Sequence, residues 1–295
     1  MKRRDLLKTA AVGAVGSTLS SQAQAPRAAA DPAFKITNKR IRQSVMGWCF
    51  NPMKASELIP HCAAIGLQGI EGISRNDYPL AKQHGLDISL VGSHGFKDGP
   101  ADPAKHEMVV DKIKEGVDVA VKFGAKRVIT FTGFTVDGVG PEQMTKNCVE
   151  GWKKAVGYAE KNDITICFEH LNTRDDTHHM KGHPGYFGDD VDHCIDMIRQ
   201  VDSPNFKLLF DIYHVSIMNG DIIRRMRKFK DYIGHLHTAG NPGRAELDDT
   251  QEINYPAIMK VVLEIGFDGF VAQEFIPTWE DKILALRHGC AVCDV

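Results

Sequence analysis

The feature that most constrains the fold of this chain is an alternation of short, β-branched apolar runs with longer amphipathic stretches, which repeats every roughly 30 residues. The apolar runs predict strands at 44–50, 69–73, 87–91, 127–132, 164–169, 206–210, 232–237 and 269–273. The stretches between them predict helices at 55–65, 78–84, 105–123, 141–160, 189–200, 221–229, 255–265 and 278–288. Eight such units predict a (β/α)₈ TIM barrel. A doubly wound open sheet is the alternative, but the first expected strand is not followed by the G-x-G-x-x-G pattern that favours such a sheet.

The first 25 residues have the pattern of an export signal. The pair Arg3 and Arg4 precedes a mildly apolar run, and Ala23 and Ala25 have the small-x-small spacing of a cleavage site. The run is too short to be a permanent membrane anchor. A frayed amphipathic tail is the alternative. We expect a twin-arginine signal peptide at 1–25, a linker at 26–40, one barrel domain at 41–295, and export to the periplasm.

Charge and cysteine content limit the possible partners. The formal net charge is −2, and removing a leader with a net charge of +3 takes it to −5. A mildly acidic chain without a basic stripe has no electrostatic reason to bind nucleic acid or anionic lipid. We expect a small-molecule partner, and a homo-oligomer remains open.

Five of the seven cysteines lie in apolar contexts that favour buried free thiols. Cys290 and Cys293, a C-x-x-C pair, remain unassigned.

Four ionisable residues lie at the carboxyl ends of consecutive expected strands. Glu169 ends the fifth strand, Asp211 the sixth and His237 the seventh, and Glu274 follows the eighth. In a barrel these ends meet at the face that carries the active site. An acid in such a place is about as often the N-cap of the next helix, but four together favour a metal site. Three oxygen ligands and one imidazole suit Mn²⁺ or Mg²⁺, and Co²⁺ or Zn²⁺ would also fit.

Several neighbouring residues are candidates for substrate binding. His214 follows Asp211 by three positions, where it could contact the substrate, support a ligand or cap a helix. Arg244 lies in a Gly/Pro-rich loop and could bind a carboxylate or a hydroxyl, or be a solvated loop residue. His235 and His237 alternate along one strand, and we expect one of them to point away from the barrel axis. The full set of expected substrate-binding residues is His214, Arg244, His94 and Asn172.

A cation between two glutamates indicates a type of chemistry. Removing a proton beside a carbonyl is slow unless the negative charge that forms is stabilised, and a divalent cation on the adjacent oxygens does this. Glu169 and Glu274 could then take the proton and return it at the neighbouring carbon or on the opposite face. The first outcome is an aldose–ketose isomerisation, and the second is an epimerisation.

Several segments resemble the hydroxypyruvate isomerase family, which belongs to the xylose isomerase-like barrels. They are Phe168–Asp175, Pro184–Tyr186, Phe210–His214, Gly234–Arg244, Glu252–Tyr255 and Gly266–Glu274. The resemblance implies that Glu169 and Glu274 are the acid/base pair and also metal ligands, with Asp211 and His237 completing the metal shell. Hydroxypyruvate isomerases tend to carry Gln at the position of His237, and their loop after the Asn-Thr-Arg-Asp run is shorter than the histidine-rich loop of this chain.

The leading hypothesis is therefore a metal-dependent isomerase or epimerase of a small hydroxy-ketone or sugar. A second hypothesis uses the same metal and base for elimination, as an exported lyase or hydrolase of 3-keto-glycosides. A third is a non-catalytic sugar-binding barrel. The presence of both glutamates favours the enzymes.

Overall fold

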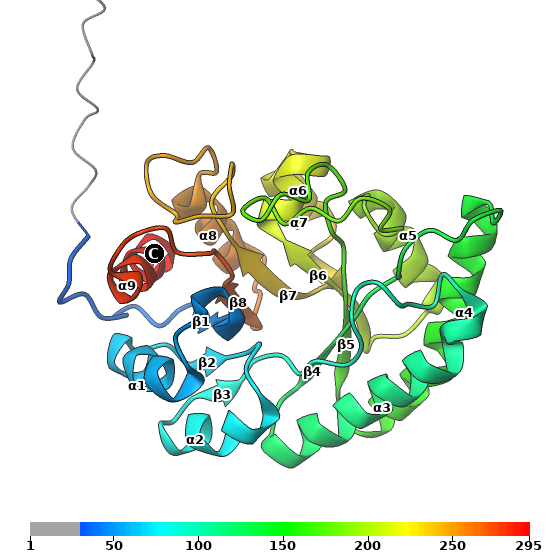
Figure 1. Cartoon of the computed structure of the whole chain (residues 1–295), viewed down its shortest axis with the longest axis horizontal. Coiled ribbons are helices and arrows are strands. Elements are labelled where there is room, and N and C mark those ends of the chain that lie inside the picture. Colours follow the sequence, from blue (N-terminus) through cyan, green and yellow to red (C-terminus); the bar gives the residue numbers. More distant parts are fainter. Residues whose placement is uncertain (1–29) are drawn as a thin grey trace, which may run out of the picture.

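Within residues 30–295, which the computed structural model describes, eight short parallel strands surround a common axis, with helices outside them (Figure 1). Six strands are paired in the order β1-β8-β7-β6-β5-β4, and β2 pairs with β3. Single parallel bridges, Met46 to Glu71 and Val91 to Val128, join this pair to the rest and close the ring. The predicted TIM barrel is confirmed. The strands are β1 Arg42–Val45, β2 Gly69–Ile70, β3 Asp87–Ile88, β4 Arg127–Thr130, β5 Thr165–Glu169, β6 Phe206–Asp211, β7 Ile233–Thr238 and β8 Phe270–Gln273.

The ends of several helices are set by their capping residues. Gly124, at φ 73°, ends α3 in a left-handed conformation that glycine adopts without strain. Pro141 occupies the first position of α4, where its missing N–H is no loss. The Asp281 carboxylate accepts from the backbone amides of Ile283 and Leu284 and begins α9. The helices are α1 Ala55–Ile65, α2 Tyr78–Gln83, α3 His106–Phe123, α4 Pro141–Lys161, α5 Val191–Val201, α6 Ile212–Met218, α7 Ile222–Lys228, α8 Tyr255–Glu264 and α9 Lys282–Cys293.

Several expected elements differ from the structure in their bounds. The strands predicted at 69–73 and 87–91 end at Ile70 and Ile88, and the helix predicted at 278–288 is Lys282–Cys293. Two further differences lie next to the site. The predicted strand at 44–50 ends at Val45, and Gly47–Phe50 forms a 3₁₀ turn, because the Gly47 amide bonds to the Glu71 carbonyl and the chain leaves the barrel wall. The predicted helix at 221–229 is preceded by a second helix, α6. The Asp211 carboxylate starts α6 by accepting from the amides of Tyr213 and His214 at 2.8 and 3.2 Å.

Apolar packing holds the barrel from both sides of its wall. Outside the strands, Trp152 of α4 packs on Phe168 and Phe206, with ring centroids 4.7 and 4.9 Å apart. Inside, Leu90, Ile129, Cys167 and Leu209 form a small apolar layer. Because side chains alternate along a strand, the residue two positions after a member of this layer also points inward. Cys167 thus leads to Glu169, and Leu209 leads to Asp211, at the open end of the barrel.

The expected signal peptide lies outside the described residues, and of the expected linker only 30–40 is described. Ile36 is buried there, and the Asp294 carboxylate accepts from the backbone amides of Thr37 and Asn38. This segment therefore lies along the end of α9. None of the helices in the described part of the chain has the length and apolarity needed to cross a membrane.

Candidate active site

The four residues predicted as metal ligands converge at the carboxyl ends of β5 to β8. Glu169 and Asp211 are the last residues of their strands, His237 is the last but one of β7, and Glu274 directly follows β8. All four are buried, and one nitrogen or oxygen atom of each lies within 4.8 Å of the others. The structure therefore brings together the whole predicted set.

The bonding around this cluster fits a cation. Four buried atoms point into it without a well-aligned hydrogen bond, one from each residue: Glu169 Oε1, Asp211 Oδ2, His237 Nδ1 and Glu274 Oε2. Buried polar atoms in folded proteins almost always have partners, and these four face one another closely enough to share one bound cation. Three carboxylates and one imidazole are a donor set for a hard divalent cation, and the residues present fit one.

The carboxylates are held in different electrostatic environments. Burial raises the pKa of Glu169 to about 7 and that of Asp211 to about 6. Burial acts on Glu274 in the same direction, but Arg244 and His237 outweigh it and lower the pKa of that carboxyl to about 2. The two glutamates therefore differ strongly in proton affinity although they share one cluster.

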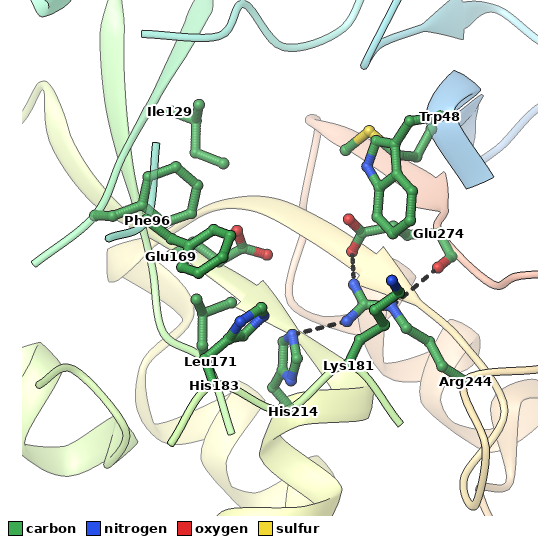
Figure 2. A pocket seen from close by; sticks show the side chains of 12 residues that line it. Trp48, Phe96, Ile129, Glu169, Leu171, Lys181, His183, His214, Arg244 and Glu274 are labelled. Carbon is green, nitrogen blue, oxygen red and sulfur yellow. Dashed lines mark hydrogen bonds and ion pairs between the residues drawn. The ribbon is translucent and has the colours of Figure 1, made fainter. Parts of the chain in front are cut away.

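Arg244 and His214 form one side of the site (Figure 2). The Arg244 guanidinium lies 2.6 Å from Glu274 Oε2, and its Nη1 lies 3.0 Å from His214 Nε2. His214 Nδ1 accepts from the backbone amide of Asn172 at 3.2 Å. Burial, followed by the charge of Arg244, keeps the pKa of His214 well below its usual value, so its ring is neutral. The sequence predicted these three as substrate-binding residues, and the structure places them together beside the cluster.

His94, the fourth residue predicted to bind substrate, lies behind the cavity wall beside the ends of β3 and β4. Its Nδ1 contacts the carbonyls of Gly95 and Asp98 at 3.0 and 2.8 Å, and its Nε2 contacts Thr130 Oγ1 at 2.9 Å. Its ring packs on Phe131, at a centroid distance of 5.9 Å, and Phe131 lines the cavity above the cluster. Both ring nitrogens of His94 are therefore used to hold the loop after β3.

The cavity above the cluster has a volume of about 370 Å³ and a largely apolar wall (Figure 2). Three residues of the long loop after β5 line it: Leu171, Lys181 and His183. The ring of His183 packs on Phe96, with centroids 4.3 Å apart. His178 and His179 of the same loop are exposed. Sequence reasoning did not find the other apolar lining residues, because apolar side chains at strand ends and in loops do not stand out from the core. They are Met46, Trp48, Phe96, Ile129 and Phe131.

The expectation that His235 and His237 point to opposite sides of the β7 strand was wrong. Residues two apart share a face of a strand, so both rings point into the barrel. Both meet the buried carboxylate of Glu71, which follows β2: its Oε1 lies 2.8 Å from His237 Nε2, and its Oε2 lies 3.0 Å from His235 Nε2. Glu71 was not predicted. The expected strand at 69–73 placed it mid-strand, and an acid in the middle of a short apolar run was the available signal.

Comparison with known proteins assigns the chain to a family. The family described as "Xylose isomerase-like TIM barrel" matches residues 61–290. The chain belongs to this family. This xylose isomerase-like barrel is 29% identical over 227 residues to the hydroxypyruvate isomerase of Escherichia coli K12, covering 73% of this chain and 85% of the relative.

Two further comparisons agree with this. The 2-oxo-tetronate isomerase of Cupriavidus necator is 29% identical over 227 residues, covering 73% of this chain and 84% of that protein. The fold of this xylose isomerase-like barrel is similar to that of the D-psicose 3-epimerase of Clostridium cellulolyticum H10 with D-tagatose. The TM-score is 0.68 at 18% identity, covering 86% of this chain and 97% of the other. The predicted resemblance to hydroxypyruvate isomerases and the predicted isomerase or epimerase class are confirmed.

Proposed function

We propose that this protein is a divalent-metal-dependent isomerase that moves a proton at the carbon beside the carbonyl of a small hydroxy-keto acid or ketose. The observation that carries the proposal is the convergence of Glu169 and Glu274, from the ends of β5 and β8, on one buried cluster that lines the cavity. Two carboxylates placed beside a reacting carbon can take a proton from it and return the proton at the neighbouring carbon or on the opposite face.

Glu169, Asp211, His237 and Glu274 would hold the cation, and the donor set favours Mn²⁺ or Mg²⁺. When bound, such an ion would polarise the substrate carbonyl and stabilise the negative charge that develops beside it. Arg244 and His214 line the same side of the cavity and can orient the substrate's oxygens. Trp48 and Phe96 shield the site from water, which strengthens each of these polar interactions.

Charge at the cavity supports a substrate that carries a carboxylate. Lys181 and Arg244 place two positive charges at the cavity wall, where a substrate carboxylate could pair with either of them. The Nζ of Lys181 lies over the Trp48 ring, 6.0 Å from the ring centroid. A monoanionic substrate would therefore find a partner for its charge at this wall. The relatives named above act, by their names, on hydroxypyruvate and 2-oxo-tetronate, which are both hydroxy-keto acids.

The test is to replace each glutamate by glutamine and to measure turnover of hydroxypyruvate and a panel of ketoses. Glu169→Gln and Glu274→Gln should each lower kcat by about 10²–10⁴, because each removes one proton-transfer group. Both should retain measurable Mn²⁺ binding. Glu246→Gln is the matched control. Glu246 is a buried glutamate bonded to Thr278 and Trp279, outside the cluster, and its variant should keep wild-type turnover.

Product analysis in D₂O by NMR distinguishes the competing reactions. Solvent deuterium at the substrate carbon is expected for proton transfer, whereas release of an aglycone from a 3-keto-glycoside would indicate elimination instead. Unchanged turnover in either glutamate variant would refute the proposed mechanism. A wild-type protein that binds substrates without converting them would indicate the non-catalytic alternative.

A further inference from the structure

Beneath the four-residue cluster lies a second group of polar side chains, centred on the Glu71 carboxylate. Glu71 is fully buried and accepts three hydrogen bonds. His237 Nε2 donates at 2.8 Å, Ser89 Oγ at 2.5 Å, and His235 Nε2 lies 3.0 and 3.2 Å from its two oxygens. These donors come from the ends of β3 and β7, so the group ties together three separate parts of the barrel wall.

The bond from His237 to Glu71 determines which ring nitrogen faces the cluster. A neutral imidazole carries one N–H and one lone pair. Because Nε2 carries the proton that it donates to the Glu71 carboxylate, Nδ1 is the nitrogen that can give up its proton and offer a lone pair to a cation. His237 Nδ1 is the atom that lies 2.7 Å from Glu274 and 3.3 Å from Glu169. The nitrogen able to bind a cation thus points at the site where the carboxylates converge.

We propose that Glu71 is a positioning residue, which fixes the tautomer and the ring orientation of His237 so that Nδ1 is presented to the cation. His235 and Ser89 hold the Glu71 carboxylate in place. This inference rests on the proposed metal site, but not on the substrate or the reaction. A carboxylate behind a ligating histidine fixes the ring and raises the basicity of the ligating nitrogen.

Glu71, His235 and His237 could alternatively be regarded as a separate three-ligand cation site. The hydrogen bonds argue against this. Both Glu71 oxygens and both Nε2 atoms already have partners, whereas each of the four residues of the upper cluster has a buried atom without a well-aligned hydrogen bond. The Glu71 carboxylate is therefore satisfied without an ion, and the atoms that converge in the upper cluster are not.

The test is metal affinity measured without reference to turnover. Glu71→Gln keeps the shape of the side chain but removes its charge, and Mn²⁺ should bind about 10- to 100-fold more weakly in a chelator competition. Glu246→Gln, which alters a buried glutamate with three donors of its own, should bind Mn²⁺ like the wild type. The visible spectrum of bound Co²⁺ should change in the Glu71 variant and not in the control.

A double-mutant cycle tests whether Glu71 acts on Mn²⁺ affinity through His237. In a His237→Ala background the ring that Glu71 positions is gone, so Glu71→Gln should change Mn²⁺ affinity by less than about twofold. If Glu71→Gln does not fold, Glu71→Asp keeps the charge but is too short to reach both histidines, and it should weaken binding in the same way. A folded Glu71→Gln protein with wild-type Mn²⁺ affinity would overturn the inference. A wild-type protein that binds neither Mn²⁺, Mg²⁺ nor Co²⁺ would instead refute the metal site and the proposed function.

Discussion

Arg244 is the residue on which the electrostatics of the site depend most. It is buried at 3% exposure, with its guanidinium beside Glu274 and Asp211, at 2.6 and 3.5 Å. Arg244→Met should destabilise the metal-free protein by about 3 kcal/mol at pH 7, because a buried carboxylate loses its partner. Denaturant unfolding in EDTA measures this loss. Arg225→Met, which breaks a pair with the half-exposed Asp192, should cost no more than about 1 kcal/mol.

The cost of Arg244→Met should depend on pH in a defined direction. The pKa of Glu274 is lowered in the folded protein, from its ordinary 4.5 to about 2. A lowered pKa contributes stability that is present above the unfolded value and is lost as the pH falls toward the folded value. The difference between wild type and variant should therefore be largest above about pH 5 and shrink as the pH approaches 2. A difference that grows with acidification would contradict this account of Glu274.

At the scale of elements, the loop after β5 is held by its backbone over the cavity. The His183 amide donates to the Asn172 carbonyl at 2.7 Å, and Tyr213 Oη donates to the Met180 carbonyl at 2.6 Å. A Cβ at Gly182 would collide with the Asp175 carbonyl oxygen, so Gly182→Ala should displace Lys181 and His183. We expect KM to rise about tenfold with little change in Tm, since a small misplacement of substrate-positioning groups is costly.

The matched control for this loop is Gly95→Ala, in the loop after β3. A Cβ there would meet nothing within 4 Å, so KM and Tm should stay at wild-type values. Steady-state kinetics gives the KM of both variants, and thermal unfolding gives their Tm. Equal KM values for wild type and Gly182→Ala would show that the geometry of the loop after β5 does not position the substrate.

The sequence predicted those site residues that lie at the ends of regular strands, and it missed those whose role depends on distant partners. Glu169 and Asp211 were predictable because a barrel places all strand ends at one face, so position along a strand sets position in space. Glu71 was not recognised as a site residue, since β2 is short and its partners, His235 and Ser89, come from distant parts of the sequence. The helix α6 was missed because Asp211 reads as a site acid while it also caps that helix. Tertiary partners of this kind leave no local pattern.

At the scale of the whole molecule, the seven cysteines bear on how the chain would reach the periplasm. All seven are free and buried. Burial raises their pKa values, for Cys167 and Cys293 to about 12, so these thiols stay protonated and unreactive while the barrel is folded. A chain exported unfolded would expose seven thiols to an oxidising compartment. Export in the folded state, which the twin-arginine pattern predicts, would keep them covered.

This proposal gives a two-part expectation for the full-length chain in a bacterium with twin-arginine machinery. The wild type should be recovered from the periplasm with a new N-terminus at Pro26 and seven free thiols, whereas the double variant Arg3→Lys, Arg4→Lys should stay in the cytoplasm with its leader. Lys8→Arg leaves the arginine pair intact and should be exported normally. Cell fractionation with intact-mass measurement, and thiol labelling after denaturation, give both readouts. Wild-type protein kept in the cytoplasm at full length would exclude the export signal. Disulfides in periplasmic protein would mean that it crossed before the barrel had buried its thiols, because the closed barrel leaves none of them within reach of an oxidant.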